Sequence, residues 1–316
     1  MSVGSRTTQL LQRTSQARRQ LLTASYSALT QACELTADDP QDAELVTDRP
    51  VPVWSLPRSR STLALVHPDP DSAWALLRDA HLLREHRVAV AGPWYDTVRV
   101  AGGHGVTFWT DPGARSGDPT LSAWVTASVH RIDPGSHSAL PQHDPFAGLL
   151  DGLDDAPLDD AGRRFLRERA TLLHHEWDAI DWPTPPTVIL GDRAMAPVHD
   201  DGTHTRLALR HPLWRGHREW DLVAARWRSE LLTGHRVDHQ AYADTYLGYE
   251  QGSTIPAHAY IGAWPGYQVV RDIVVLAAVI DTVRRAHLDA STRQQAVHQI
   301  SCLRGAHPRP WTWGQR

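Results

Sequence analysis

The sequence of 316 residues has no Lys and no Asn, and Arg supplies all 32 of its basic side chains other than His. It has only two Cys, Cys33 and Cys302, which lie too far apart in the sequence to give the paired spacing of a redox or zinc site. We expect both to be free thiols. The longest apolar run, residues 273–280, is far too short to span a bilayer, and Arg13 and Arg18 interrupt the early stretch where a signal peptide would lie. These absences predict a soluble, cytoplasmic protein with no membrane partner.

A surplus of positive charge is also missing, since the net charge is -4 with His neutral. This balance provides no general attraction to nucleic acid, which we do not expect as a partner. The 41% of hydrophobic and 22% of charged residues are ordinary for a globular protein, and the length allows two lobes with separate cores. The use of Arg without Lys, with abundant Ala, Asp, His and Trp, is typical of a high-GC genome such as that of actinobacteria.

The chain is organised around residues 188–222, which predict a strand, a loop, a hairpin and the start of a helix. A short apolar run ends at Gly191-Asp192. Asp201-Gly202 then separates two extended segments, and this dipeptide is the turn chemistry of a hairpin. The block closes with Arg-Glu-Trp-Asp-Leu at 218–222, where the carboxylate is expected to brace the loop at a helix start.

This block resembles the catalytic centre of the aminoglycoside phosphotransferase and choline kinase family, which usually reads His-Gly-Asp, four residues, Asn, a hairpin, then Ile-Asp-Trp/Phe. The segment from Gly216 to Leu222 is similar to the Gly-x-x-x-x-Asp-Leu that closes the block there. The resemblance covers about residues 50–290. It implies an α+β, two-lobed protein-kinase-like fold, with a small β-rich N-lobe carrying one main helix, a larger mainly helical C-lobe, and here an extra N-terminal helix. The implied domains are 1–50 for the N-terminal helix and linker, 51–115 for the N-lobe and 116–316 for the C-lobe.

The block departs from the family at the residues that carry the chemistry. Phosphoryl transfer on this scaffold needs a base, oxygen ligands for Mg²⁺ and a cation on the nucleotide phosphates. Asp192 falls at the position of the base, but Leu190 replaces the His before it. Pro197 stands in place of the metal-binding Asn, and Leu209 in place of the second metal ligand, an Asp. No shift of alignment recovers these groups, because the chain has no Asn or Lys and has no Asp between residues 203 and 220. We therefore expect no metal site.

The expected N-lobe departs as well. The turn between its first two strands has no Gly that would let the backbone approach phosphates. Ala64 and Leu65 are the candidates for the place of the phosphate-binding cation. Arg58 and Arg60 in the turn could substitute for that cation, although Arg in a turn more often faces solvent. Asp79 matches the acidic partner of the missing cation, and we expect it to be solvated.

The hairpin carries positive charge where the family gathers acidic ligands. Alternation along an extended strand predicts Arg206 and Arg210 on one face and Leu207 and Leu209 on the other. If that face opens toward the cleft, Arg206, Arg210 and the neighbouring His211 could bind a carboxylate or a phosphate, because guanidinium groups match both. If it faces outward, these are ordinary solubilising residues.

A helix is expected over residues 7–33, because apolar residues recur there at spacings of three and four. Its apolar stripe would consist of Leu10, Ala17, Leu21, Ala24 and Ala28. The helix either packs on its own lobe or serves as an arm for a partner. Residues 34–50, rich in Asp, Glu and Pro, are expected to be a linker.

The resemblance and its departures together predict a catalytically degenerate protein, a pseudokinase. It would bind a peptide, a small molecule or a partner enzyme at the inter-lobe cleft, in a natural-product pathway such as ribosomal peptide biosynthesis, and would need no cofactor. Asp221 would then have a structural role. The alternative is an enzyme: an atypical small-molecule or peptide phosphotransferase that uses Asp192 with ATP and Mg²⁺, or a new activity on the same cleft. The sequence leaves the oligomeric state open.

Overall fold

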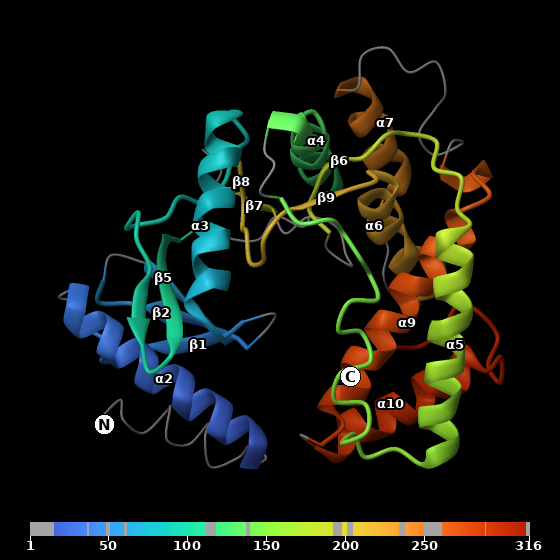
Figure 1. Cartoon of the computed structure of the whole chain (residues 1–316), viewed down its shortest axis with the longest axis horizontal. Coiled ribbons are helices and arrows are strands. Elements are labelled where there is room, and N and C mark those ends of the chain that lie inside the picture. The colour runs from blue at the N-terminus through green and yellow to red at the C-terminus, as the bar shows by residue number, and fades with distance from the viewer. Residues whose placement is uncertain are drawn as a thin grey trace. The chain divides into compact units, whose positions relative to one another are not determined.

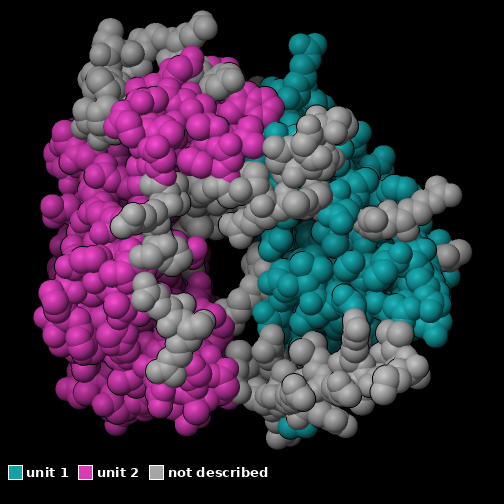
Figure 2. All heavy atoms as spheres, turned by 180° about the vertical axis from the view of Figure 1, so that it is seen from behind, with its two compact units in different colours: residues 1–117, 197–213 teal, residues 118–196, 214–316 magenta. Residues whose placement is uncertain are grey.

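The chain divides into two compact units. Unit 1 comprises residues 1–117 and 197–213, and unit 2 comprises residues 118–196 and 214–316 (Figure 2). The hairpin of the organising block therefore belongs to unit 1, although the chain on either side of it belongs to unit 2. The computed structural model describes residues 16–36, 38–48, 51–59, 62–111, 118–136, 140–191, 198–200, 205–233, 238–249, 261–287 and 289–313.

Unit 1 is built on a five-stranded antiparallel sheet of order β1-β2-β3-β5-β4 (Figure 1). The strands are β1 Glu44–Thr47, β2 Val53–Leu56, β3 Thr62–His67, β4 Arg99–Ala101 and β5 His104–Thr110. Gly102 and Gly103 join the last two strands with φ of 56° and 82°, which suits a tight hairpin turn. The expectation of a linker over residues 34–50 is wrong toward its C-terminal end, because β1 pairs there with β2 and extends the sheet.

Helix α2, Gln16–Thr36, packs on one face of this sheet. Its buried Leu22 and Leu29 lie in one core with Trp54 and Phe108, and the Trp54 indole N–H donates to the Ser25 hydroxyl at 2.7 Å. The predicted stripe is wrong in part, because Leu21 is 49% exposed and Ala24 is exposed. The periodicity allows two neighbouring faces, and the sheet takes the one with more apolar surface. Leu10 lies outside the described residues.

Helix α3, Pro70–Glu85, covers the other face of the sheet. Its N-cap is Asp69, whose carboxylate accepts a hydrogen bond from the Ser72 backbone N–H at 2.7 Å. Gly105 of β5 leaves room for the helix, since a Cβ there would lie 2.6 Å from the Ala73 Cβ. Two further short strands belong to unit 1, β7 Val198–Asp200 and β8 Thr205–Leu207. They pair with each other, and Leu207 exchanges backbone hydrogen bonds of 2.8 and 2.9 Å with residues 89 and 91.

Unit 2 is mainly helical. Its central helix is α9, whose Ile273, Val274 and Ile280 are fully buried. Burial of each such side chain contributes about 1.5–3 kcal/mol relative to exposure. The short strands β6 Thr187–Ile189 and β9 Trp214–Gly216 form a two-stranded sheet. The helices are α4 Pro119–His130, α5 Asp160–Asp178, α6 Glu219–Leu231, α7 His239–Tyr249, α9 Tyr267–Arg285 and α10 Ala290–Leu303, with a 3-10 turn η1 at Pro134–Ser136.

The fold class is α+β, as predicted, with the sheet in one unit and most helices in the other. On α5, Leu166 and Leu173 are buried, whereas Leu172 is 48% exposed. Both Cys33 and Cys302 are free and buried. None of the helices within the described ranges combines the length and the apolar character needed to cross a bilayer.

Candidate functional site

The catalytic base position of the family falls just after a well-defined segment of unit 2. Residues 192–197 and 201–204 lie outside the described residues, so Asp192 and Pro197 receive no structural account. Strand β6 leads into Leu190 and Gly191, which are described. Gly191 has φ of +67°, and a Cβ there would overlap the ring of Trp214 on β9. Glycine is therefore required at 191 both by backbone conformation and by space.

Asp221 is the centre of a buried hydrogen-bond network in unit 2. It lies in the first turn of α6 and is 5% exposed. Its Oδ2 accepts a hydrogen bond from the Leu190 backbone N–H at 2.7 Å, and its Oδ1 accepts one from the Gly191 N–H at 2.9 Å. Asp221 thereby holds the backbone immediately before Asp192 in the sequence.

His130, at the end of α4, extends this network. Its Nε2 lies 3.0 Å from Asp221 Oδ2, and its Nδ1 lies 2.7 Å from the Tyr246 hydroxyl on α7. A carboxylate can only accept, so the proton lies on Nε2, and in a neutral ring Nδ1 then accepts from Tyr246. Burial raises the pKa of the neighbouring Tyr242, and the charge of Asp221 adds to this effect. The network thus joins α4, α6, α7 and the segment after β6.

The start of α6 is held by a second buried carboxylate. Glu219 is fully buried in the first turn of the helix, where a negative charge complements the helix dipole. The Thr184 hydroxyl donates to it, with its oxygen 2.9 and 3.1 Å from the two carboxylate oxygens. His217 stacks on Trp182 with ring centres 4.2 Å apart. Asp221 therefore sits on a helix whose first turn is rigidly positioned.

Asp79 in unit 1 is fully buried, which overturns the expectation that it would be solvated. Its Oδ2 accepts a hydrogen bond from the Leu213 backbone N–H at 2.7 Å, and its Oδ1 lies 3.1 Å from the Arg78 guanidinium. Burial raises the pKa of this carboxyl, and the two donors oppose that shift. A side-chain cation is not needed here, because a backbone N–H also satisfies a buried carboxylate.

The described residues that the resemblance assigns to the metal and phosphate positions have hydrocarbon side chains. Leu209, in place of the second metal ligand, is 5% exposed. Leu65 pairs with Thr107 and is 3% exposed. It lies on the sheet face that α3 covers, which is the face from which a cation at this position could reach Asp79. Hydrocarbon side chains offer neither an oxygen ligand nor a positive charge. Ala64, the other candidate position, is fully buried against α2.

The predicted anion-binding residues of the hairpin all lie in unit 1. Arg206 pairs with His199 across β7 and β8, and Arg206, Arg210 and His211 are each half-buried. His211 Nδ1 lies 3.3 Å from the Pro212 carbonyl oxygen. The predicted alternation ends with β8, because both residues 208 and 209 are buried. The chain beyond β8 is no longer extended and paired, so strand periodicity does not govern it.

Arg58, in the turn between β2 and β3, has acidic partners from the segment before β1. Its guanidinium lies 3.3 Å from Asp39 and 2.5 Å from Asp42, and it donates to the Gln41 side chain at 2.9 Å. Attraction to Asp42 raises the pKa of Arg58 further. Arg60 lies outside the described residues.

The sequence patterns do not predict two features of unit 2. The first is the pair of His130 and Asp221, because no spacing in the sequence links two residues that lie 91 positions apart. The second feature is a group formed by His298, Cys302 and His307, whose ligand atoms lie within 4.8 Å of one another. The four-residue spacing of His298 and Cys302 on a helix is the signal in the sequence for this group.

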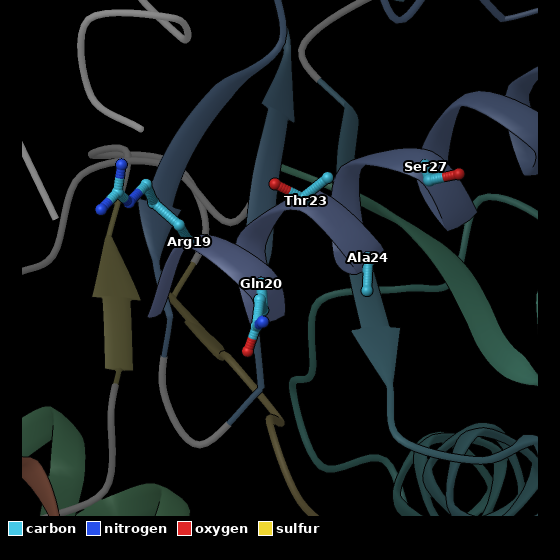
Figure 3. A pocket seen from close by; sticks show the side chains of 5 residues that line it. All are labelled: Arg19, Gln20, Thr23, Ala24 and Ser27. Atoms are coloured by element: carbon cyan, nitrogen blue, oxygen red, sulfur yellow. The ribbon is translucent and has the colours of Figure 1, made fainter. Parts of the chain in front are cut away.

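On unit 1, an open depression along α2 is lined by exposed residues only, namely Arg19, Gln20, Thr23, Ala24 and Ser27 (Figure 3).

Comparison with known proteins rests on structure rather than sequence. No protein-family model matches the chain, and no curated protein matches it. It is similar to the structure of amicoumacin kinase hAmiN in complex with AMP-PNP, Ca²⁺ and Ami, at a TM-score of 0.65 and 10% identity, over 90% of this chain and 96% of that one. It is also similar to a choline/ethanolamine kinase family protein from Mesorhizobium loti, at a TM-score of 0.57 and 14% identity, over 89% and 94%.

A third similar structure is the aminoglycoside phosphotransferase APH(3'')-Id from Streptomyces rimosus in complex with ADP and streptomycin. The TM-score is 0.53 and the identity 13%, over 79% of this chain and 97% of that one. Identities this low carry information about the fold alone. The chain therefore has the two-lobed, kinase-like fold that aminoglycoside phosphotransferases and choline kinase-like proteins share.

Proposed function

We propose that this chain is a non-catalytic protein on a phosphotransferase fold, a pseudokinase, that serves as a binding or partner subunit in natural-product biosynthesis. One observation carries the proposal: no Lys or Asn exists anywhere in the chain, and buried Leu209 and Leu65 stand where a metal ligand and a phosphate-binding cation are needed. Without those groups, the charge of a transferring phosphoryl group is not neutralised.

The use of Asp79 supports this proposal. In an active site of this type, the acidic residue of the main N-lobe helix pairs with the phosphate-binding cation. Here Asp79 accepts a hydrogen bond from the Leu213 backbone instead, and so fastens the end of the hairpin segment to α3 within unit 1. The carboxylate has a structural partner that does not depend on a nucleotide. This arrangement suits a scaffold better than a nucleotide site.

The ligand we propose is a peptide or small molecule with a carboxylate or phosphate group. Arg206 and Arg210 supply guanidinium groups in the hairpin segment, and these can bind either anion. A ribosomal peptide precursor belongs to this class. The structures of amicoumacin kinase and of the Streptomyces phosphotransferase are complexes with Ami and with streptomycin, so these proteins of similar fold bind a further ligand besides a nucleotide.

Nucleotide binding tests the proposal directly. The thermal midpoint of the purified chain should be measured with excess ATP, with and without Mg²⁺, and with Mg²⁺ alone as the control. A ligand at about 100 times its dissociation constant adds roughly 2.7 kcal/mol. With an unfolding entropy of roughly 2.1 cal/mol/K per residue, that amounts to a rise of about 4 °C for a chain of this length. We expect no magnesium-dependent rise, and a rise of this size would contradict the proposal.

A second candidate is an atypical phosphotransferase that uses Asp192. It is favoured by the Asp221 network, which holds the backbone just before Asp192 as an active base would require. This candidate predicts a magnesium-dependent thermal shift together with ATP turnover that Asp192→Asn abolishes. If the chain is instead a non-catalytic binding protein, we expect no ATP turnover, and Asp192→Asn should bind a synthetic acidic peptide with the affinity of the wild type. A double variant, Arg206→Ala with Arg210→Ala, should weaken that peptide affinity if the hairpin binds the anion.

A further inference from the structure

A cluster of soft and borderline metal ligands lies at the end of α10, in unit 2. His298 and Cys302 are four residues apart on the helix and therefore project from the same side of it. The Cys302 sulfur lies 3.7 Å from His298 Nε2, and the thiol is 2% exposed. His307 contributes the third ligand atom, and all three lie within 4.8 Å of one another. The set contains no carboxylate, so its chemistry differs from that of a magnesium site.

The chain is shaped so that His307 returns to the helix. Gly305 follows the helix with φ of +80°, a conformation that reverses the chain at low cost for glycine. Its N–H donates to the Cys302 carbonyl at 3.0 Å, and the Ala306 N–H donates to the Ser301 carbonyl at 3.1 Å. The Ser301 hydroxyl lies 3.1 Å from His307 Nε2 and orients the ring. The imidazole rings of residues 298 and 307 have centres 4.8 Å apart.

The segment after His307 is fixed as well. The Trp311 indole N–H donates to the His307 carbonyl at 3.3 Å, and the Trp311 backbone N–H donates to Leu231 at 2.7 Å. Trp311 stacks on Trp313 with ring centres 4.9 Å apart, and both side chains are 4% exposed. His307 is thus held between a helix-terminating turn and a buried aromatic anchor. These contacts hold the backbone of His307 beside the end of α10.

We propose that His298, Cys302 and His307 form a binding site for a divalent transition metal of the zinc class. Zinc takes Cys sulfur at about 2.3 Å and His nitrogen at about 2.1 Å, and a tetrahedral arrangement places these two atoms about 3.6 Å apart. The observed sulfur-to-nitrogen distance of 3.7 Å matches that value. His298 and His307 also line an open depression, together with Arg293, Gln294, Val297 and Ser301.

The metal would fasten the end of the chain to α10. His298 and Cys302 belong to the helix, whereas His307 belongs to the segment that carries Trp311 onto the end of α6. A metal that binds all three ligands cross-links these two parts and favours the folded form of unit 2. The site stands independently of the proposed pseudokinase function, because it uses none of the residues of the organising block.

Cobalt provides the probe, because a thiolate bound to Co²⁺ gives an intense near-ultraviolet charge-transfer band and tetrahedral Co²⁺ gives strong visible bands. Tag-free full-length protein should be stripped with a chelator and titrated with CoCl₂. We expect saturation of both sets of bands at one equivalent and their loss when ZnCl₂ is added. Absence of the charge-transfer band with excess Co²⁺ would overturn the proposal and leave a thiol-to-imidazole hydrogen bond as the whole role of the cluster.

Variants assign the ligands. Cys302→Ser should lose the charge-transfer band, and His307→Gln should weaken Co²⁺ binding at least tenfold. His307 is exposed, so this variant keeps the test valid if the change at the buried Cys302 prevents folding. Cys33→Ser removes the other thiol, in unit 1, and His174→Gln removes an exposed His of α5, and both should bind as the wild type does. A band that survives Cys302→Ser, or that disappears in Cys33→Ser, would refute the assignment.

Discussion

Replacing Asp221 with Ala would remove the acceptor of three buried hydrogen bonds in unit 2. The donors left behind are the backbone N–H groups of Leu190 and Gly191 and the Nε2–H of His130. A buried donor without a partner costs about 1–3 kcal/mol, which sets an upper range of about 3–9 kcal/mol for three. Water that enters the space of the deleted carboxylate recovers part of this cost. We therefore expect a loss of about 3–5 kcal/mol in the free energy of unfolding, comparable with the removal of one partner from a buried ion pair.

Two measurements together test this expectation. Denaturant unfolding followed by Trp fluorescence reports the free energy of unfolding, and the buried Trp220 directly precedes Asp221 in α6. Hydrogen exchange of peptides that cover residues 187–191 reports the local effect. A loss of about 3 kcal/mol corresponds to roughly 100-fold faster exchange at Leu190 and Gly191. Asp178→Ala, at an exposed carboxylate of α5, should leave both measurements unchanged.

Asp221→Asn provides the intermediate case. Oδ2 accepts from Leu190 and His130, whereas Oδ1 accepts only from Gly191. An amide that keeps its oxygen at the Oδ2 position retains two hydrogen bonds and turns its NH₂ group toward the Gly191 N–H. The loss should therefore be smaller than in Asp221→Ala. A loss of less than about 1 kcal/mol in Asp221→Ala, the net value of a single ordinary hydrogen bond, would show that Asp221 does not satisfy these three donors.

Three further predictions concern pH and backbone conformation. Burial lowers the pKa of His67 to about 4, so the unfolded chain takes up a proton at a higher pH than the folded chain does. The free energy of unfolding should therefore fall by about 2 kcal/mol between about pH 7 and about pH 5. His67→Gln should flatten this decline in urea unfolding at the two pH values. Burial raises the pKa of Asp79, so its ionisation costs stability as the pH rises through the raised value. Asp79→Asn should be at least as stable as wild type at neutral pH. Asp79→Ala should lose about 1–3 kcal/mol of unfolding free energy, because the Leu213 N–H then has no acceptor. An Ala variant as stable as wild type would contradict the role of Asp79 as that acceptor. Gly191→Ala should lower the free energy of unfolding by about 2–5 kcal/mol, because the new Cβ meets both a positive φ and the ring of Trp214. Gly152 has φ of +68° and open space around it, so Gly152→Ala should show the cost of the positive φ alone. Equal losses for the two Gly variants would rule out the overlap.

Much of the helical architecture follows from sequence pattern. Helix α4 begins directly after Asp118, α9 after Pro265-Gly266 and α10 after Asp289. Apolar periodicity and flanking Pro, Gly and Asp mark such elements locally. Strand β1 gives no strand signal of its own, because its four residues lie in a segment rich in acidic residues and only pairing with β2 makes it a strand.

Side-chain environments were predicted less well, because they depend on contacts that no local pattern encodes. The periodicity of α2 allowed two faces, and packing against Trp54 selected the one with Leu22 and Leu29. Asp79 was expected in solvent, yet the Leu213 N–H makes its burial tolerable. Leu213 lies 134 residues further along the chain, so its proximity is a consequence of the fold.

By itself the sequence determined which chemical groups are available, because composition does not depend on folding. No Lys or Asn can reach any site in a chain that contains neither, and the two Cys are the only thiols. Tertiary structure decided which groups meet. The Gly305 turn and the burial of Trp311 return His307 to Cys302, and α6 carries Asp221 to the backbone of Gly191. Each contact exists because burial of apolar surface elsewhere fixes the chain path, and that free energy is a property of the whole unit rather than of any segment.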